Sequence, residues 1–303
     1  MITDRKLLPE NVDDILKKAM NIEVIRPQNL SWARIRAALG LEASNDPVPD
    51  GVYLIQDDLG LGGIFVEGDV DQMVLAIDGA FQAVFFRMGE ASWELRFSPS
   101  LGLTAFKSPE GFRDYNLLPK GFIIVDGTIE SLGGGTVDPF GEIFPTEDEI
   151  PSILNGVRLT IISSERISIS SHLLHQGVDW SSGIPVMADS RSHLSILASG
   201  HDILGTETAK GEIVIDDDAP DGLKLQASIT ALKTGFKIEG EEKTIRLLGS
   251  LHSPDYDSGE NRLEIIRDSR LEGNSDLLAN APRLASSLVF IGSLKPQGWR
   301  ILR

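Results

Sequence analysis

Four aspartates in the segment 216–222 form the densest group of potential metal ligands in the chain. Asp216, Asp217, Asp218 and Asp221 stand within six residues, and a proline and a glycine close the segment. Hard carboxylate oxygens at this density, helped by backbone carbonyls and water, could hold a calcium ion. Their spacing matches neither the EF-hand loop nor the glycine-rich calcium repeats, and aspartate and glycine are also typical of tight corners. The four aspartates are therefore candidate calcium ligands, and the competing interpretation is a solvated acidic turn without any cofactor.

Two histidines are the other candidate ligands. His172 and His175 are three residues apart and Asp179 follows, a set that could bind zinc. Side chains three residues apart meet on a helix but not on a strand, and residues 168–174 favour a strand that turns into a loop. We expect two isolated surface histidines rather than a zinc site.

Catalytic motifs are missing from the sequence. It contains no Gly-x-Ser-x-Gly elbow, no phosphate-binding loop and no dinucleotide fingerprint. A glycosidase or polysaccharide lyase would need two carboxylates, or a calcium-binding carboxylate and a basic residue, in one groove. When residues 159–164 are laid over residues 194–199, Thr160 and Ser164 fall over serines and no carboxylate pair arises. The sequence predicts a protein that is not an enzyme, with a secreted carbohydrate-active β-helix enzyme as the alternative.

Charge and composition narrow the function further. The 303 residues include 45 acidic and 28 basic side chains, for a formal charge of −17. Such a negative field repels phosphate backbones, so we expect no nucleic acid as a partner. The absence of cysteine removes disulfides and thiolate chemistry. No apolar stretch reaches the roughly 18 residues of a membrane helix, and residues 1–6 lack the apolar core of a signal peptide.

A segment that occurs twice indicates how these residues are positioned. Residues 63–73 and 122–132 each contain a β-type run, an acidic residue with a glycine, and a second run, so that Glu67 matches Asp126 at an offset of 59. The two serine-bearing runs compared above have an offset of 35. Short apolar runs with Gly or Asp at the corners favour a coiled sheet, and a β-sandwich is the alternative. We therefore predict an all-β protein whose body, residues 48–303, is a right-handed β-helix or β-solenoid.

The first 47 residues have a helical pattern instead. Apolar residues at helical spacing predict one helix over 9–20 and a short one over 31–39, with Ser31 as its cap and Gly40 as its stop. Turn-forming residues at 45–51 mark a boundary. We expect a small helical N-terminal cap, residues 1–47, that covers the open end of the β body.

Several segments of the β body resemble a known group of proteins. They are Val48-Pro-Asp-Gly-Val-Tyr53, Gly63-Ile-Phe-Val-Glu-Gly-Asp-Val70, Leu118-Pro-Lys-Gly-Phe-Ile-Ile-Val-Asp-Gly-Thr-Ile129, Leu159-Thr-Ile-Ile-Ser-Ser164, Ile213-Val-Ile-Asp-Asp-Asp-Ala-Pro-Asp221, Ile229-Thr-Ala-Leu232, Gly249-Ser-Leu251 and Arg267-Asp-Ser-Arg-Leu271. Over about residues 48–271 the chain resembles the extracellular part of uncharacterised bacterial proteins found with type IV pilus and prepilin-like genes. The resemblance implies a β-helical ectodomain that is tethered by an N-terminal hydrophobic helix.

The chain departs from that family pattern at both ends. It has no N-terminal apolar helix, and it has a further predicted strand at 287–291 where the pattern leads us to expect a proline-rich tail. From the resemblance we expect a non-enzymatic structural or adhesive ectodomain at the cell surface or in the periplasm. Its expected partners are other pilus or envelope proteins, and glycans. Contact with the membrane is expected only through an N-terminal segment that this sequence does not include.

Overall fold

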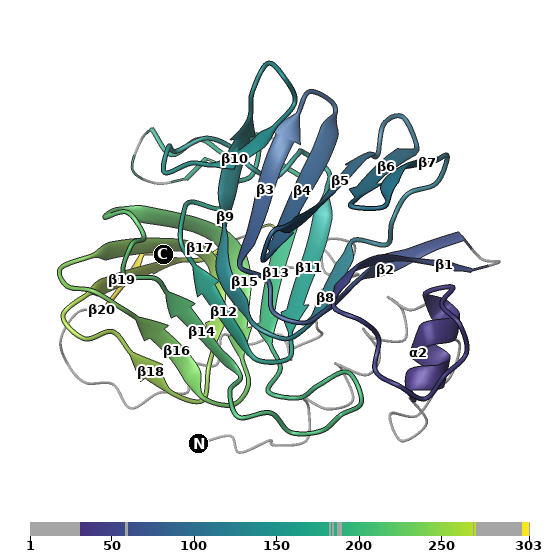
Figure 1. The fold of residues 1–303 in the computed structure, drawn as a ribbon. Coiled ribbons are helices and arrows are strands. Elements are labelled where there is room, and N and C mark those ends of the chain that lie inside the picture. Colours follow the sequence, from purple (N-terminus) through teal and green to yellow (C-terminus); the bar gives the residue numbers. More distant parts are fainter. Residues whose placement is uncertain are drawn as a thin grey trace.

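The computed structural model describes residues 31–57, 60–181, 183, 185–186, 190–268, 270 and 299–302. Within these ranges the protein is an all-β structure with one short helix, as the sequence predicts (Figure 1). The helix predicted over 9–20 and the strand predicted over 287–291 lie outside the described residues.

The strands form two sheets. The first sheet contains, in spatial order, β1 (Gly51–Asp57), β2 (Gly60–Glu67), β8 (Phe122–Asp126), β11 (Arg158–Ser163), β13 (His193–Ala198), β15 (Leu223–Ala231), β17 (Thr244–His252), β19 (Arg262–Ile266) and β20 (Trp299–Leu302). The second contains β18 (Tyr256–Asp257), β16 (Gly235–Ile238), β14 (Glu212–Ile215), β12 (Arg166–Ile169), β9 (Ile129–Val137), β3 (Gln72–Asp78), β4 (Phe81–Met88), β5 (Ala91–Ser98), β6 (Leu103–Ser108) and β7 (Gly111–Tyr115), with β10 (Ile143–Pro145) paired to β9.

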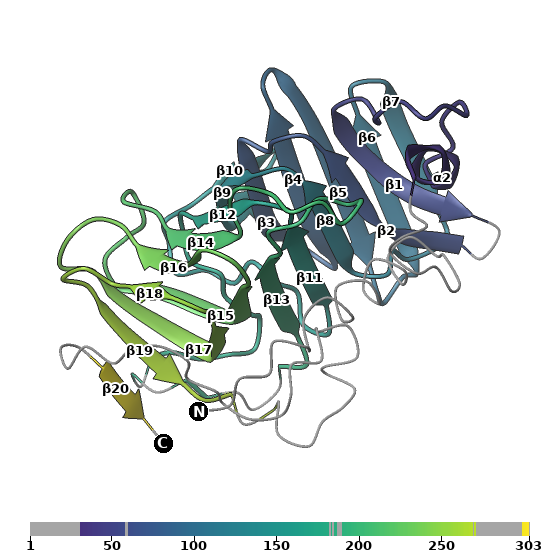
Figure 2. The same cartoon turned by 90° about the horizontal axis from the view of Figure 1, so that it is seen from below.

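The chain passes back and forth between the two sheets. It crosses from β2 to β3, returns at β8, and from β8 to β19 its consecutive strands alternate between the sheets, apart from β10. Neighbouring strands from β2 to β20 in the first sheet are all parallel, and so are those from β18 to β3 in the second. Figures 1 and 2 show this stack extending from α2 and β1 to β19 and β20.

The two sequence repeats correspond to residues that are paired in register on neighbouring parallel strands. Glu67 is the partner of Asp126 in the β2–β8 pair, which is the offset of 59, and Leu159 is the partner of Leu194 in the β11–β13 pair, which is the offset of 35. Parallel pairing places equivalent residues of successive strands side by side, so a sequence repeat survives as strand register. Both overlays are confirmed.

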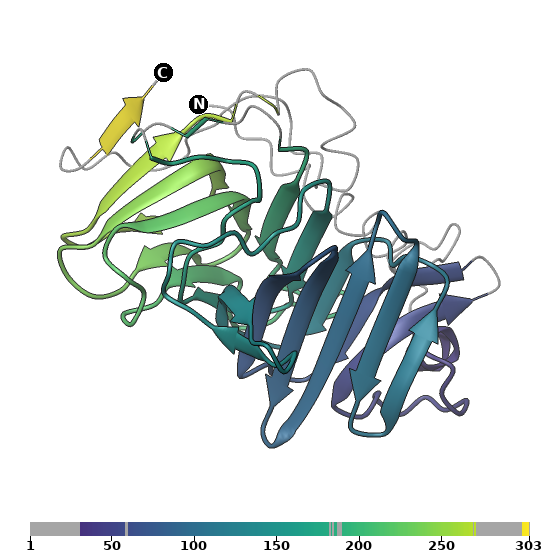
Figure 3. The ribbon, with the colours of Figure 1, turned by 90° about the horizontal axis from the view of Figure 1, so that it is seen from above.

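The longer first offset has a structural cause. Between β3 and β8 the second sheet is extended by an antiparallel meander, β4 to β7, in which each strand pairs with the next. Figure 3 shows these strands side by side at the end of the molecule opposite β18 and β19. The meander lengthens one passage between the sheets, which explains the offset of 59. The second offset does not continue because later passages are shorter, with offsets of 33, 22 and 18 between partners such as Ser195 and Ser228, Leu223 and Ile245, and Thr244 and Arg262.

Aliphatic side chains fill the space between the sheets. One row crosses five strands of the first sheet in register and is at most 2% exposed: Ile64, Ile123, Ile161, Ile196 and Ile229. β-branched side chains of this kind favour the pleated backbone, and each buried one stabilises the fold by about 1.5–3 kcal/mol. The core is therefore a continuous aliphatic stack along the strand ladder.

A second cluster lies on the outer face of the first sheet. The helix α2 (Trp32–Ala38) buries Ile35 completely, in one cluster with Phe65 of β2 and Ile124 of β8. This helix confirms the one predicted over 31–39, and Gly40 follows it with a positive φ of 69°. Ser31 occupies the N-cap position, as predicted, although its side chain makes no cap hydrogen bond with any described residue. The division into a cap, 1–47, and a body, 48–303, stays a prediction.

The single helix of the described residues is too short and too polar to cross a membrane.

Candidate functional site

Two carboxyl groups stand side by side at the ends of β2 and β8. Along β2, Ile64 and Val66 point into the core, so Phe65 and Glu67 lie on the outer face. The register pairs Glu67 with Asp126 on the next strand. Adjacent strands are about 4.8 Å apart, so the two side chains, on one face of one sheet, are direct neighbours.

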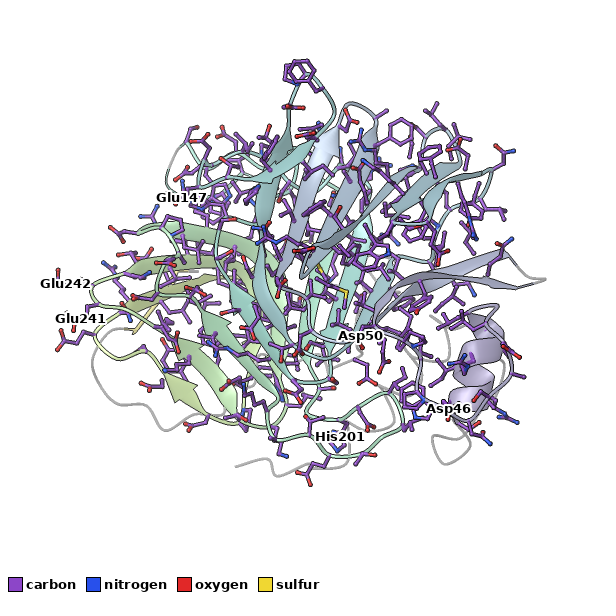
Figure 4. The ribbon with its side chains drawn as sticks, in the orientation of Figure 1. Asp46, Asp50, Glu147, His201, Glu241 and Glu242 are labelled. Carbon is purple, nitrogen blue, oxygen red and sulfur yellow. The ribbon has the colours of Figure 1, made fainter. Side chains whose placement is uncertain are left out.

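Asp126 accepts hydrogen bonds from its surroundings, whereas Glu67 has a buried oxygen without such a partner. The Ile203 amide donates a hydrogen bond to Asp126 Oδ1 at 3.2 Å, and the Ser164 hydroxyl donates another. Asp50, labelled in Figure 4 just ahead of β1, lies against Gly68, where an added Cβ would come within 3.1 Å of its carboxyl carbon. One carboxyl oxygen of Glu67, Oε2, is buried without a hydrogen-bond partner among the described residues.

These surroundings raise both pKa values. Burial, followed by the charges of Asp126, Asp50 and Asp202, raises the pKa of Glu67 to about 8. Burial also raises the pKa of Asp126 to about 6, although the hydrogen bond from Ile203 opposes the shift. Like charges this close resist ionising together, so the pair keeps one proton up to a higher pH than an isolated carboxyl group does.

A protonated carboxyl group beside an ionised one is an acid–base pair. In glycosidases, a pair with separated pKa values about 5 Å apart is the geometry of the retaining reaction. That chemistry also needs a cleft over the two groups that admits a sugar chain.

The hollow found among the described residues lies at the other end of the same strands. It measures about 550 Å³, and its lining includes Phe122 at the start of β8 and Arg158 at the start of β11. Asp126 ends β8, which places it about 13 Å away along the five residues of that strand. The hollow and the carboxyl pair therefore do not form one site.

The predicted calcium loop contacts a lysine. The ammonium group of Lys243, which is only 8% exposed, donates to the carbonyl oxygens of Asp216 at 3.1 Å, of Asp217, and of Ala219 at 2.7 Å. Backbone carbonyls are the groups that would help carboxylates to hold calcium. Here these carbonyl oxygens accept hydrogen bonds from the ammonium group of Lys243 instead.

The carboxylates of that loop accept hydrogen bonds from protein groups. Asp216 accepts from the Asp218 amide at 2.9 Å and from the Ser168 hydroxyl at 3.2 Å, and Asp221 accepts from the Thr244 amide at 2.9 Å. Within the described ranges, no three His, Cys, Asp or Glu side chains gather as metal ligands. Calcium at Asp216, Asp217, Asp218 and Asp221 stays a prediction.

The two histidines are buried, which corrects the prediction of surface histidines. His172 is 4% and His175 is 1% exposed, because the segment that carries them runs beside β15, where Leu173 forms a parallel β-bridge with Leu225. His172 Nδ1 accepts a hydrogen bond from the Lys224 amide at 2.9 Å. Neither ring nitrogen of His175 has a partner in the part of the chain that is described. Asp179 is exposed and accepts hydrogen bonds from Ser181, so the three candidate zinc ligands are not brought together.

No family model, no curated protein and no solved structure matches the chain.

The pair of Glu67 and Asp126 is the site that sequence reasoning missed. The signal was present, because the offset of 59 aligns one acidic residue with the other. The prediction that no carboxylates stack was based on the second overlay, residues 159–164 on 194–199, which aligns serines. Parallel pairing in register turns an aligned pair in the sequence into a contact in space.

Proposed function

We propose that the protein is a non-enzymatic structural or adhesive ectodomain, built as a right-handed two-sheet β-solenoid. It acts at the cell surface or in the periplasm, together with other pilus or envelope proteins, as the resemblance to pilus-associated ectodomains implies. The single observation that carries the proposal is the unbroken parallel ladder from β2 to β20, with its aliphatic stack inside. In such a stack each coil of the chain contacts only the coils next to it, which gives a stiff rod suited to presenting a surface.

The separation of acid groups and hollow supports a role without catalysis. The carboxyl pair lies at the C-terminal ends of β2 and β8, and the hollow lies near the N-terminal ends of β8 and β11. A carbohydrate-active enzyme needs both in one place. Asp126 instead serves the fold, because it accepts a hydrogen bond from the Ile203 amide and so holds the loop that carries Ile203 at the end of β8.

A deletion strain with variant complementation tests the proposal. Loss of the gene is expected to reduce pilus number or surface adhesion, and immunogold labelling is expected to place the protein outside the cytoplasmic membrane. The double variant Glu67→Gln and Asp126→Asn, whose folding is checked by circular dichroism, should restore both properties. Cytoplasmic labelling, or a deletion without any effect on pili or adhesion, would contradict the proposal.

The second candidate function is a retaining carbohydrate-active enzyme. The observation that favours it is the pair of neighbouring carboxyl groups with raised and separated pKa values, Glu67 and Asp126, on adjacent strands. In this case Glu67 would be the general acid and Asp126 the nucleophile. The test is release of reducing ends from neutral and acidic polysaccharides. Activity that disappears in Glu67→Gln while the fold persists would establish this candidate over the structural one.

A further inference from the structure

Arg270 joins two segments that lie 80 positions apart in the sequence. It follows β19, and its guanidinium group donates to the carbonyl oxygen of Ser190, ahead of β13, at 3.1 Å. The same group donates to both carboxylate oxygens of Asp268, from Nε at 2.9 Å and from Nη2 at 2.6 Å. Forked, charge-assisted bonds of this kind fix the direction of both groups as well as their distance. We call Asp268, Arg270 and Ser190 the arginine clamp.

Two buried histidines lie beside the arginine clamp. His193, the first residue of β13, is 4% exposed, and His175 is 1% exposed. The charges of Asp268 and Arg270 both act on His193, and those of Arg270 and His193 act on His175. Arg158, the strand partner of His193 on β11, adds a further positive charge. The groups that face the two imidazoles are therefore one carboxylate and two guanidinium groups.

Neither imidazole is placed to carry a charge. Nε2 of His193 shares a hydrogen bond with the Ser195 hydroxyl at 2.9 Å, and the ring nitrogens of His175 have no partner among the described residues. The nearby oxygen of Gln226 already accepts from the backbone amide of His175 at 2.7 Å. A protonated imidazole donates from both nitrogens, and a buried charge without such partners is costly. Both rings are thus built into the fold in their neutral form.

These surroundings lower both pKa values. Burial lowers the pKa of His193 from 6.5 to about 4, with Asp268 opposing the shift and Arg270 adding to it. Burial, followed by the charges of Arg270 and His193, lowers the pKa of His175 well below its ordinary value. The closed state therefore binds fewer protons than a state in which the imidazoles reach water. Its advantage is complete above pH 6.5 and is lost as the pH falls toward 4.

We propose that the arginine clamp and the two histidines form an acid-sensitive joint, which opens when His175 and His193 take up protons. At neutral pH the charge of Asp268 is matched by Arg270. In acid the same carboxylate faces Arg270 and two imidazolium groups, and parting the segment after β19 from the segment before β13 lets these cations reach water. The aliphatic stack between the sheets stays closed, so the opening is local. This inference does not depend on the proposed function.

Amide hydrogen exchange of the full chain between pH 4.5 and 6.5, followed by NMR, measures the opening. The reporters are the amides of His175 and of His193, which donates to the Val157 carbonyl oxygen at 3.1 Å. After correction for intrinsic exchange, their protection should fall about tenfold per pH unit for each histidine, or about a hundredfold for both. Local opening exposes little surface, so dilute urea should change these rates less than those of the amides of β8. Reporters that match β8 in both pH and urea dependence would show global unfolding and overturn the proposal.

Variants assign the pH dependence to its groups. His193→Asn and His175→Gln should each remove about one factor of ten per pH unit. Arg270→Gln should increase opening at pH 7 at least tenfold, because the Ser190 carbonyl oxygen loses its donor. The control, His201→Asn at an exposed position, should change protection less than twofold.

Three results would overturn the joint. They are an unchanged pH dependence in His193→Asn, an equal loss of pH dependence in His201→Asn, and unchanged opening in Arg270→Gln. Circular dichroism at pH 7 checks the folding of every variant. If His175→Gln does not fold, His193→Asn and Arg270→Gln still decide between the joint and a purely structural cluster.

Discussion

Replacing Glu67 by glutamine should stabilise the protein at alkaline pH. The side chain keeps its shape, and the amide, like the protonated acid, is uncharged beside the neighbouring Asp126. What changes is the ability to ionise. In the wild type, a rise in pH forces a second negative charge beside Asp126, with Asp50 and Asp202 adding to the repulsion.

The sign and size follow from the shifted pKa. The pKa of Glu67 is raised from 4.5 to about 8, so the native state binds more protons than the unfolded chain between these values. The stability from this group is complete below pH 4.5 and is lost as the pH rises through 8. At about 1.4 kcal/mol per pKa unit the whole shift would amount to roughly 5 kcal/mol. Because the side chain is only partly buried, screening by water reduces this to about 2 kcal/mol.

Urea unfolding at two pH values measures the effect. We expect Glu67→Gln to unfold with about the same free energy as the wild type near pH 5 and with about 2 kcal/mol more near pH 8.5. The exposed Glu130 offers the control, since Glu130→Gln should leave both values unchanged within about 0.5 kcal/mol. A Glu67→Gln protein that is no more stable than the wild type near pH 8.5 would refute the argument that the two carboxyl groups share one proton.

Three further predictions concern other parts of the fold. Lys243→Met should lower the free energy of unfolding by about 2–4 kcal/mol, because three carbonyl oxygens lose a charged donor. The control, the exposed Lys237→Met, should lower it by under about 0.5 kcal/mol, both values measured by urea unfolding. EDTA should leave the wild-type Tm unchanged, and a fall in Tm would support the calcium prediction. Burial lowers the pKa of His193 from 6.5 to about 4. The wild type should therefore lose about 3 kcal/mol of its free energy of unfolding as the pH falls from 6.5 to 4, because the unfolded chain takes up the proton first. His193→Asn should remove this pH dependence, and an equally steep dependence in the variant would assign it to another group. Gly249→Ala should destabilise the protein by at least about 2 kcal/mol, because the φ of Gly249 is 147° and a Cβ there would collide with the Ala227 carbonyl oxygen. Calorimetry measures the Tm, and an unchanged Tm would show that β15 and β17 can move apart.

The sequence carried enough information for the strand ladder. The repeats gave the register of β2 on β8 and of β11 on β13, because parallel in-register stacking preserves side-chain type from strand to strand. The meander β4–β7 was not foreseen as an insertion, although its strands were recognised as short β runs. Antiparallel hairpins and parallel turns are made of the same kind of apolar run, and only the pairing distinguishes them.

Burial of the two histidines shows where sequence reasoning fails. A histidine in a polar loop gives no sign of its exposure, because burial depends on which strands lie beside the loop. Leu173 pairs with Leu225 of β15. There the Gln226 side chain accepts a hydrogen bond from the His175 amide at 2.7 Å. These two residues are 51 positions apart, and no local pattern connects them. The prediction of surface histidines was wrong for this reason.

The acidic loop at 216–221 illustrates the same limit for a predicted site. Its composition suggests a cation, and the fold supplies one from a neighbouring corner, the ammonium of Lys243. Gly240 has a φ of 81° and lies against both groups, since a Cβ there would press on the Asp217 carboxylate and on Lys243. Asn261 extends the stack by donating to the Gly240 carbonyl oxygen at 2.9 Å and accepting from the Lys243 amide at 2.8 Å. Three successive corners thus satisfy one another's hydrogen-bonding groups, a relation between distant segments that the local motif does not contain.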